Sequence, residues 1–128
     1  MKLLSFTLLL LLALTGWSQA DITPKVSDAI KRGDAAGVAV YFMPQVDMAL
    51  PGSDKTYSKP EAQKALAGFF VQNTVKNFMV KHQGTSKLDD QYRIGVLATS
   101  KGDYRVTFFM RKSGDVILIK QFKIEIED

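Results

Sequence analysis

The residue best suited to acid–base chemistry is His82, the one histidine in the chain. An imidazole changes protonation near neutral pH and can serve as a general base or acid. His82 shares a predicted strand face with Phe78 and Val80, so we expect it to point toward the concave side of a sheet. A catalytic imidazole also needs a carboxylate to orient it, and Asp89 and Asp90 follow only across a loop. The sequence therefore favours the alternative, in which the ring nitrogens bond to the backbone at the sheet margin.

Three tyrosines are the other candidates for a binding pocket. Tyr57, Tyr92 and Tyr104 could line the mouth of a pocket and hydrogen-bond a ligand. Tyr92 and Tyr104 each begin a predicted strand in phase with its buried residues. Together with His82, these tyrosines are the candidate pocket residues. The sequence favours the alternative, that they pack against neighbouring strands, as aromatic residues in sheets commonly do.

The familiar catalytic and cofactor motifs are absent from the sequence. The chain has no cysteine and one histidine, and its acidic residues do not follow the spacing of a calcium loop. It contains no G-x-S-x-G, Walker or G-x-G-x-x-G motif. The sequence thus predicts no metal, no cofactor and no assigned catalytic residue.

The charge of the chain argues against a nucleic-acid partner. The net charge is +4, and the basic residues are scattered rather than gathered in a run. Acidic residues lie among them at Asp89, Asp90, Asp103 and Asp115. This pattern indicates a solvated surface, and we expect no nucleic-acid binding.

The first half of the chain predicts helices and a hairpin. Two short helices are expected over residues 22–42, broken at Gly33, with Asp34 as the second N-cap and Pro44 as the end. Residues 46–50 alternate as a strand, and Pro51-Gly52 fits a type II turn. A short return strand over residues 55–57 completes the hairpin.

The main amphipathic helix is predicted from Ser58 to about Asn73. Ser58 and Glu61 have the spacing of a capping box, in which the Ser58 hydroxyl accepts a hydrogen bond from the Glu61 amide. Apolar residues then recur at helical spacing on one face, namely Ala62, Ala65, Leu66, Phe69 and Phe70. Such a helix needs a sheet to cover.

From Phe78 onward the apolar period is two, which predicts a long antiparallel meander. The expected buried faces are Tyr92, Ile94, Val96 and Ala98 in one strand, and Tyr104, Val106, Phe108 and Met110 in the next. In the last strand the phase slips at Lys120-Gln121, where a β-bulge would keep one face buried. Helices followed by a meander place the chain in the α+β class.

The residues on the opposite face of the predicted sheet indicate that this face contacts a partner protein. It is expected to carry Arg93, Arg105 and Arg111, usually a solvated set, together with Leu97, Phe109 and Ile117. A sheet with apolar residues on both faces should bury both. We therefore expect a homodimer, with Leu97, Phe109 and Ile117 as interface candidates.

Residues 1–20 have the layout of a secretory signal peptide. Lys2 precedes an apolar run over residues 8–14, and Ser18-Gln19-Ala20 resembles a cleavage site. The run is shorter than the roughly 20 residues that span a bilayer, and no cysteine is present for the lipoprotein route. We expect cleavage after Ala20 and export to the periplasm or beyond. Residues 21–128 would then form one domain with no integral membrane segment.

The chain resembles an uncharacterised family of small exported bacterial proteins in the nuclear-transport-factor-2-like superfamily. The residues that carry the resemblance are Tyr57-Ser58-Lys59, Phe69-Phe70, Asn73, Phe78, His82-Gln83-Gly84, Tyr92-Arg93-Ile94-Gly95, Tyr104-Arg105-Val106 and Ile119-Lys120-Gln121-Phe122. The resemblance implies two or three N-terminal helices packed on the concave face of a strongly curved, mainly antiparallel sheet, a cystatin-like cone with a pocket in its mouth. It implies no activity, because the superfamily holds isomerases, dehydratases, transport factors and plain binding modules.

Two main hypotheses of function follow. The first is a non-enzymatic exported domain that binds a small apolar or amphipathic ligand or another protein, for example a protein of the cell envelope. The second is a proton-abstraction enzyme of the isomerase or dehydratase type, with His82 as the base and a tyrosine polarising the substrate. The second requires a carboxylate or tyrosine hydroxyl within about 3 Å of an inward-facing His82.

Overall fold

The computed structural model describes residues 21–127, and the predicted signal peptide at residues 1–20 lies outside them. The elements in chain order are α2 (Thr23–Lys31), α3 (Ala35–Ala39), β1 (Phe42–Leu50), β2 (Ser53–Ser58), α4 (Lys59–Gln72), β3 (Val75–Thr85), β4 (Gln91–Thr99), β5 (Gly102–Ser113) and β6 (Val116–Ile126). Within the described range, no helix is both long and apolar enough to cross a bilayer.

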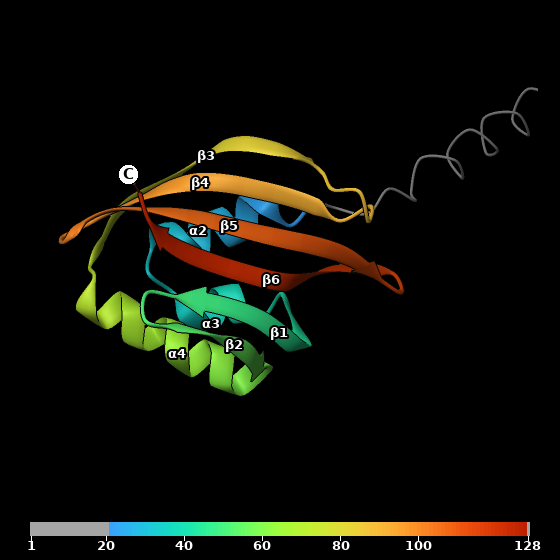
Figure 1. The fold of residues 1–128 in the computed structure, drawn as a ribbon, viewed down its shortest axis with the longest axis horizontal. Helices are drawn as coiled ribbons and strands as arrows, with labels where there is room; N and C mark the ends of the chain where they lie inside the picture. Colours follow the sequence, from blue (N-terminus) through green and yellow to red (C-terminus); the bar gives the residue numbers. More distant parts are fainter. Residues whose placement is uncertain (1–20, 128) are drawn as a thin grey trace, which may run out of the picture.

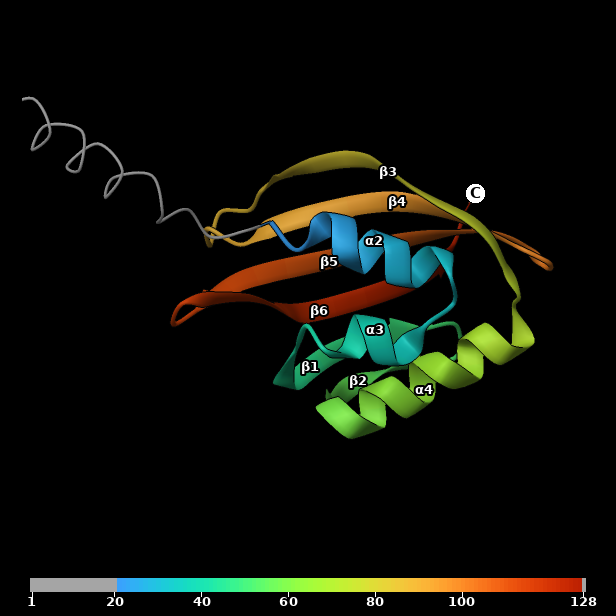
Figure 2. The same cartoon turned by 180° about the vertical axis from the view of Figure 1, so that it is seen from behind.

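The six strands form one curved sheet in the order β2-β1-β6-β5-β4-β3 (Figure 1). All neighbours are antiparallel except β1 and β6, which run parallel. The helices lie on one face of this sheet, with α4 alongside the β1–β2 hairpin (Figure 2). We call the helix-covered side the inner face and the other side the outer face. The α+β prediction with a curved, mainly antiparallel sheet is confirmed.

The second helix is shorter than the sequence predicts. It ends at Ala39, and strand β1 starts at Phe42 and runs through Pro44, where we had expected a helix end. Pro44 is tolerated because it lies in an unpaired stretch. The β1–β2 register begins at Gln45, and the β1–β6 register breaks between Phe42 and Asp47. Neither neighbour requires the N–H that proline lacks.

The predicted start of the main helix is confirmed at α4. The Ser58 hydroxyl accepts a hydrogen bond from the Glu61 amide at 3.4 Å and donates one to the Glu61 carboxylate at 2.7 Å. Ala62, Leu66 and Phe70 are the fully buried residues of the helix, while Phe69 and Ala65 are half-buried beside them. This buried face packs α4 against β1 and β2. The packing also fixes the position of the half-buried residues Ala65 and Phe69 on the same helix.

The prediction of which face of β4 is buried is wrong. Arg93, Gly95, Leu97 and Thr99 face the inner side, and the more apolar Tyr92, Ile94, Val96 and Ala98 face outward and are half-buried. Gly95 is required there because a Cβ would lie 2.7 Å from the Phe78 ring and from the Met79 carbonyl oxygen. The Arg93 side chain is buried but satisfied by hydrogen bonds to the Thr23 hydroxyl, the Tyr92 carbonyl and the Gln91 side chain.

Three bulges adjust the meander, and the extra residue in each is a lysine. Lys76 and Lys81 are unpaired in β3 opposite β4, and Lys120 is unpaired in β6 opposite β5. The bulge predicted at Lys120-Gln121 is therefore confirmed, and it keeps Ile119 and Phe122 both buried. Because β3 is an edge strand, its two bulged lysines also discourage pairing with another strand.

Candidate functional site

A hollow lies between α4 and the two hairpin turns that face it. Its volume is about 430 Å³, within the range usual for small-molecule sites. One side is the C-terminal half of α4, and the others are the β1–β2 turn and the β4–β5 turn. Its apolar lining comes from Leu50, Tyr57, Ala65, Phe69 and Tyr104.

Hydrogen bonds hold the two tyrosines of this hollow in place. The Tyr104 hydroxyl donates to the Asn73 side-chain oxygen at 3.0 Å, and the Asn73 amide donates to the Phe69 carbonyl at 2.9 Å. The Tyr57 hydroxyl lies 2.6 Å from the Ser53 hydroxyl. The Phe69 and Tyr104 rings meet edge to face, with their centroids 5.1 Å apart. The lining is thus an ordered aromatic surface with polar groups at its edge.

A glycine in the middle of α4 keeps the hollow open. Gly68 lines it, and a Cβ built there would meet no heavy atom within 4 Å. Glycine inside a helix costs about 1 kcal/mol relative to alanine. No close packing partner explains its presence. The signal in the sequence is a glycine inside a strongly predicted helix.

The hollow carries one charged side chain, a lysine, and neither a carboxylate nor an imidazole. Lys101, in the β4–β5 turn, is the only ionisable group of the lining besides the two tyrosines, and no carboxylate or imidazole joins it. Among residues 21–127, no group of three His, Cys, Asp or Glu side chains could hold a metal ion.

The structure places the four predicted pocket residues in two different locations. Tyr57 and Tyr104 line the hollow, as the sequence suggested. Tyr92 and His82 lie on the outer face. Tyr92 faces outward because the β4 phase is reversed, and its ring lies over Gly84 and 5.9 Å from the Phe109 ring. His82 also faces outward, because the bulge at Lys81 shifts it into register with Ile94, which lies on the outer face.

His82 has none of the partners that catalysis would require. It is exposed, and its side chain makes no hydrogen bond to any residue of the described range. It lines a shallow outer-face depression of about 280 Å³ that also contains Glu127. That carboxylate is already paired with Arg105 at 3.3 Å. The condition set for the enzyme hypothesis, an inward-facing and oriented histidine, is not met.

The strongest ion cluster of the described residues lies apart from the hollow, around Asp90. The side chain of Asp90 is 3 % exposed. Its carboxylate accepts two hydrogen bonds from Arg111, at 2.8 and 3.1 Å, and forms an ion pair with Lys120. The hydrogen bond from Arg111 lowers the pKa of Asp90 below its ordinary value, against the opposing effect of burial and with a further contribution from Lys120. The bulge in β6 provides Lys120, so the cluster ties the β3–β4 loop to β5 and β6.

The interface candidates are also divided by the structure. Leu97 is fully buried in the core, so the prediction that it lies on a dimer face is wrong. The cause is again that the buried side of β4 is the opposite of the one predicted. Ile117 packs against the edge of the core rather than on the outer face. Phe109 does face outward. The outer-face strip is therefore made of Met79, Ile94, Val96, Tyr92 and Phe109.

Comparison with known proteins identifies the family to which this chain belongs. Residues 23–125 match the family described as "Domain of unknown function (DUF4783)", so the chain is a member of it. A solved DUF4783 family structure from Bacteroides ovatus ATCC 8483 is 32% identical, with 88% of this chain and 100% of that chain covered and a TM-score of 0.75. Another, from Bacteroides uniformis ATCC 8492, is 30% identical over 84% of this chain and 99% of that one, with a TM-score of 0.78.

More distant similarities concern the fold alone. A protein named as an NTF2 variant is 19% identical, covers 80% of this chain and 92% of its own, and has a TM-score of 0.61. A domain of unknown function with a cystatin-like fold from Nostoc punctiforme PCC 73102 is 16% identical over 84% of this chain and 74% of its own, with a TM-score of 0.64. No curated protein sequence matches this chain. The predicted resemblance to an uncharacterised family with this cone-shaped fold is confirmed.

Proposed function

We propose that this chain is a binding domain and that the hollow between α4 and the two hairpin turns binds a small amphipathic molecule. The observation that carries the proposal is Gly68, a helix-interior glycine that lines the hollow and at which an added Cβ would meet no heavy atom within 4 Å. Glycine lowers the stability of a helix interior relative to alanine, and at this position it leaves the space beside the hollow free of a side chain. The aromatic lining supplies apolar contact, and Asn73, Gln72 and Ser53 supply polar groups at its edge.

The proposal also includes export, for which the support is the composition of residues 1–20. A binding domain outside the cytoplasm would meet amphipathic molecules released from the cell envelope or taken up from the surroundings. The proton-abstraction hypothesis is not carried forward, because His82 lies on the outer face without an orienting partner.

A fluorescent probe tests the proposed function. N-phenyl-1-naphthylamine, which is neutral and apolar, should bind with one saturable site and blue-shifted emission. Replacing Leu50, which lines the hollow, by serine should weaken binding about tenfold, as expected for the loss of one apolar contact surface. The matched control is Val96→Ser, the same type of change at a half-buried strand position on the outer face, which should leave the affinity unchanged. The absence of saturable binding, or an equal effect of both variants, would contradict the proposal.

A second candidate function, self-association, rests on the outer-face strip. Met79 is 51% exposed, and Ile94, Val96, Tyr92 and Phe109 continue the apolar surface across three strands. We expect light scattering to give twice the chain mass at micromolar concentration. A Val96→Glu variant should give the mass of one chain, because it places a charged carboxylate, opposite Arg105 in the ladder, within the apolar contact. A wild-type mass of one chain under these conditions would rule this candidate out.

A further inference from the structure

We infer that the hollow selects ligands with a negative charge: small molecules with an apolar or aromatic body and one anionic group, held at the charged end by Lys101. This inference rests on the proposed function and names the chemical class of its ligand. An apolar body would lie against the Phe69 and Tyr104 rings, and the anionic group would reach the β4–β5 turn at the mouth.

The charge of the lining is the first support. Lys101 is its only permanently charged residue, and no acidic side chain lies among the lining residues. Lys101 makes no ion pair with residues 21–127, whereas Arg93, Arg105, Arg111 and Lys120 all do. An anion that binds in the hollow would therefore meet one cation and no carboxylate among the lining side chains.

The backbone that carries Lys101 is firmly held. The Lys101 amide donates to the Thr99 hydroxyl at 3.1 Å, and that hydroxyl donates to the Gly102 carbonyl at 2.8 Å. The turn is also tied to the chain that follows α4. The Ser100 amide donates to the Thr74 carbonyl at 2.9 Å, and the Thr74 amide donates to the Ser100 hydroxyl at 3.2 Å. The turn thus presents the lysine beside the C-terminal end of α4 at a fixed position.

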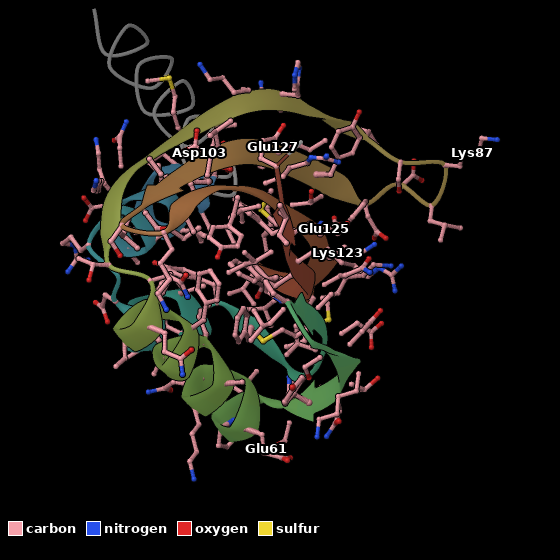
Figure 3. All side chains as sticks on the ribbon, turned by 60° about the vertical axis from the view of Figure 1, so that its left-hand side comes forward. Glu61, Lys87, Asp103, Lys123, Glu125 and Glu127 are labelled. Carbon is pink, nitrogen blue, oxygen red and sulfur yellow. The ribbon has the colours of Figure 1, made fainter. Side chains whose placement is uncertain are left out.

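The acidic residues adjacent to the lining in sequence do not neutralise this end of the hollow. Asp54 follows Ser53 in β2 and so points to the face opposite the lining residues Ser53 and Tyr57. Asp103 is paired with Ala98 in the ladder and therefore belongs to the outer face. Glu61 lies at the other end of α4, far from Asp103 in Figure 3, and is bound to Ser58. Lys101 is therefore the one charged side chain among the lining residues, with no carboxylate beside it in the lining.

A matched pair of probes tests the inference. 8-Anilinonaphthalene-1-sulfonate has the same rings as N-phenyl-1-naphthylamine and adds one sulfonate. At low salt, the sulfonate probe should bind about fivefold more tightly than the neutral one, and the difference should shrink at about 0.5 M salt. Lys101→Gln should abolish the difference between the two probes, and Lys101→Arg should keep it. Lys112→Gln, the same charge change at an exposed position at the far end of β5, should keep the difference.

Each outcome has a distinct meaning. If the neutral probe binds but the sulfonate adds nothing, the charge preference is wrong and the proposed function stands. If neither probe binds in a saturable manner, both are wrong. If Lys112→Gln lowers the preference as much as Lys101→Gln does, the effect comes from overall charge and the assignment to Lys101 is overturned.

Discussion

Replacing Gly68 by leucine should weaken binding of N-phenyl-1-naphthylamine by about tenfold or more without destabilising the protein. A Cβ at this position meets no heavy atom within 4 Å, so the leucine side chain can be accommodated, and the space it enters is the hollow itself. Leucine also has a higher helix propensity than glycine, so the free energy of unfolding should rise by about 0.5–1 kcal/mol. Binding and stability are therefore expected to change in opposite directions.

Gly68→Ala is the matched control for this prediction. Alanine gives the same gain in helix propensity, because it too removes the backbone freedom of glycine, but it adds only one methyl group. We expect a stability gain with binding close to that of the wild type. Urea unfolding and probe titration of the three proteins measure both quantities. If Gly68→Leu bound the probe as well as the wild type does, the hollow could not be the binding site.

Replacing Asp90 by asparagine should lower the free energy of unfolding by about 1–2 kcal/mol at neutral pH. Asp90 is almost fully buried and receives hydrogen bonds from Arg111 and an ion pair from Lys120, so its charge matters more than that of an exposed carboxylate. The loss should stay below that of a fully buried ion pair, because the Arg111 side chain is 46% exposed and water can take the place of its partner.

The effect of Asp90→Asn should depend on pH in a defined direction. Because Arg111 holds the pKa of Asp90 below its ordinary value in the folded protein, the carboxylate stabilises the fold fully above the unfolded-state pKa of about 4. The stabilisation is lost as the pH falls through the lower, folded-state pKa. The unfolding midpoints of wild type and variant should therefore differ at about pH 7 and converge toward about pH 2.

Asp89 offers the control for this experiment. It is the adjacent residue, exposed, with a positive φ of 63°, a conformation that asparagine tolerates well. Asp89→Asn makes the same charge change without touching Arg111 or Lys120. Its midpoint should stay close to that of the wild type at each pH. Equal losses in both variants, or a difference for Asp90→Asn that stays constant with pH, would show that the ion cluster does not stabilise the fold.

Elements with strong local signals could be predicted from the sequence. The capping residues Ser58 and Glu61 and the apolar face of α4 led to the correct helix, and Pro51-Gly52 marked the β1–β2 turn, where Gly52 has a φ of 88°. The phase slip at Lys120 located a real bulge. Each of these signals depends on residues near one another in the chain, where steric and hydrogen-bonding preferences act directly.

The orientation of β4 could not be predicted in this way, because it depends on contacts distant in sequence. Hydrophobicity alone favoured burial of Ile94 and Val96, yet the inner face takes Arg93, which bonds to Thr23 seventy positions away. The wrong assignments of Tyr92 and Leu97 follow from that one reversal. The bulge at Lys81, which moves His82 to the outer face, likewise has no clear signal in the alternation of β3.

The candidate site was predicted in part. Tyr57 and Tyr104 were expected at a pocket and line it, whereas Gly68 and Lys101 were not considered. A glycine inside a helix and a lysine in a turn are too common to single out in a sequence. Their meaning comes from the tertiary contact that brings the C-terminal half of α4 opposite the β4–β5 turn.

The central claim, that the hollow between α4 and the two hairpin turns binds small amphipathic molecules, is tested most directly by nuclear magnetic resonance. Amide correlation spectra of the ¹⁵N-labelled protein would be recorded during titration with N-phenyl-1-naphthylamine. The account predicts saturable shifts at Gly52, Gly68 and Lys101 and at the Asn73 side-chain amide. Shifts confined to outer-face residues such as Ile94 and Thr107, or no saturable shifts, would contradict it.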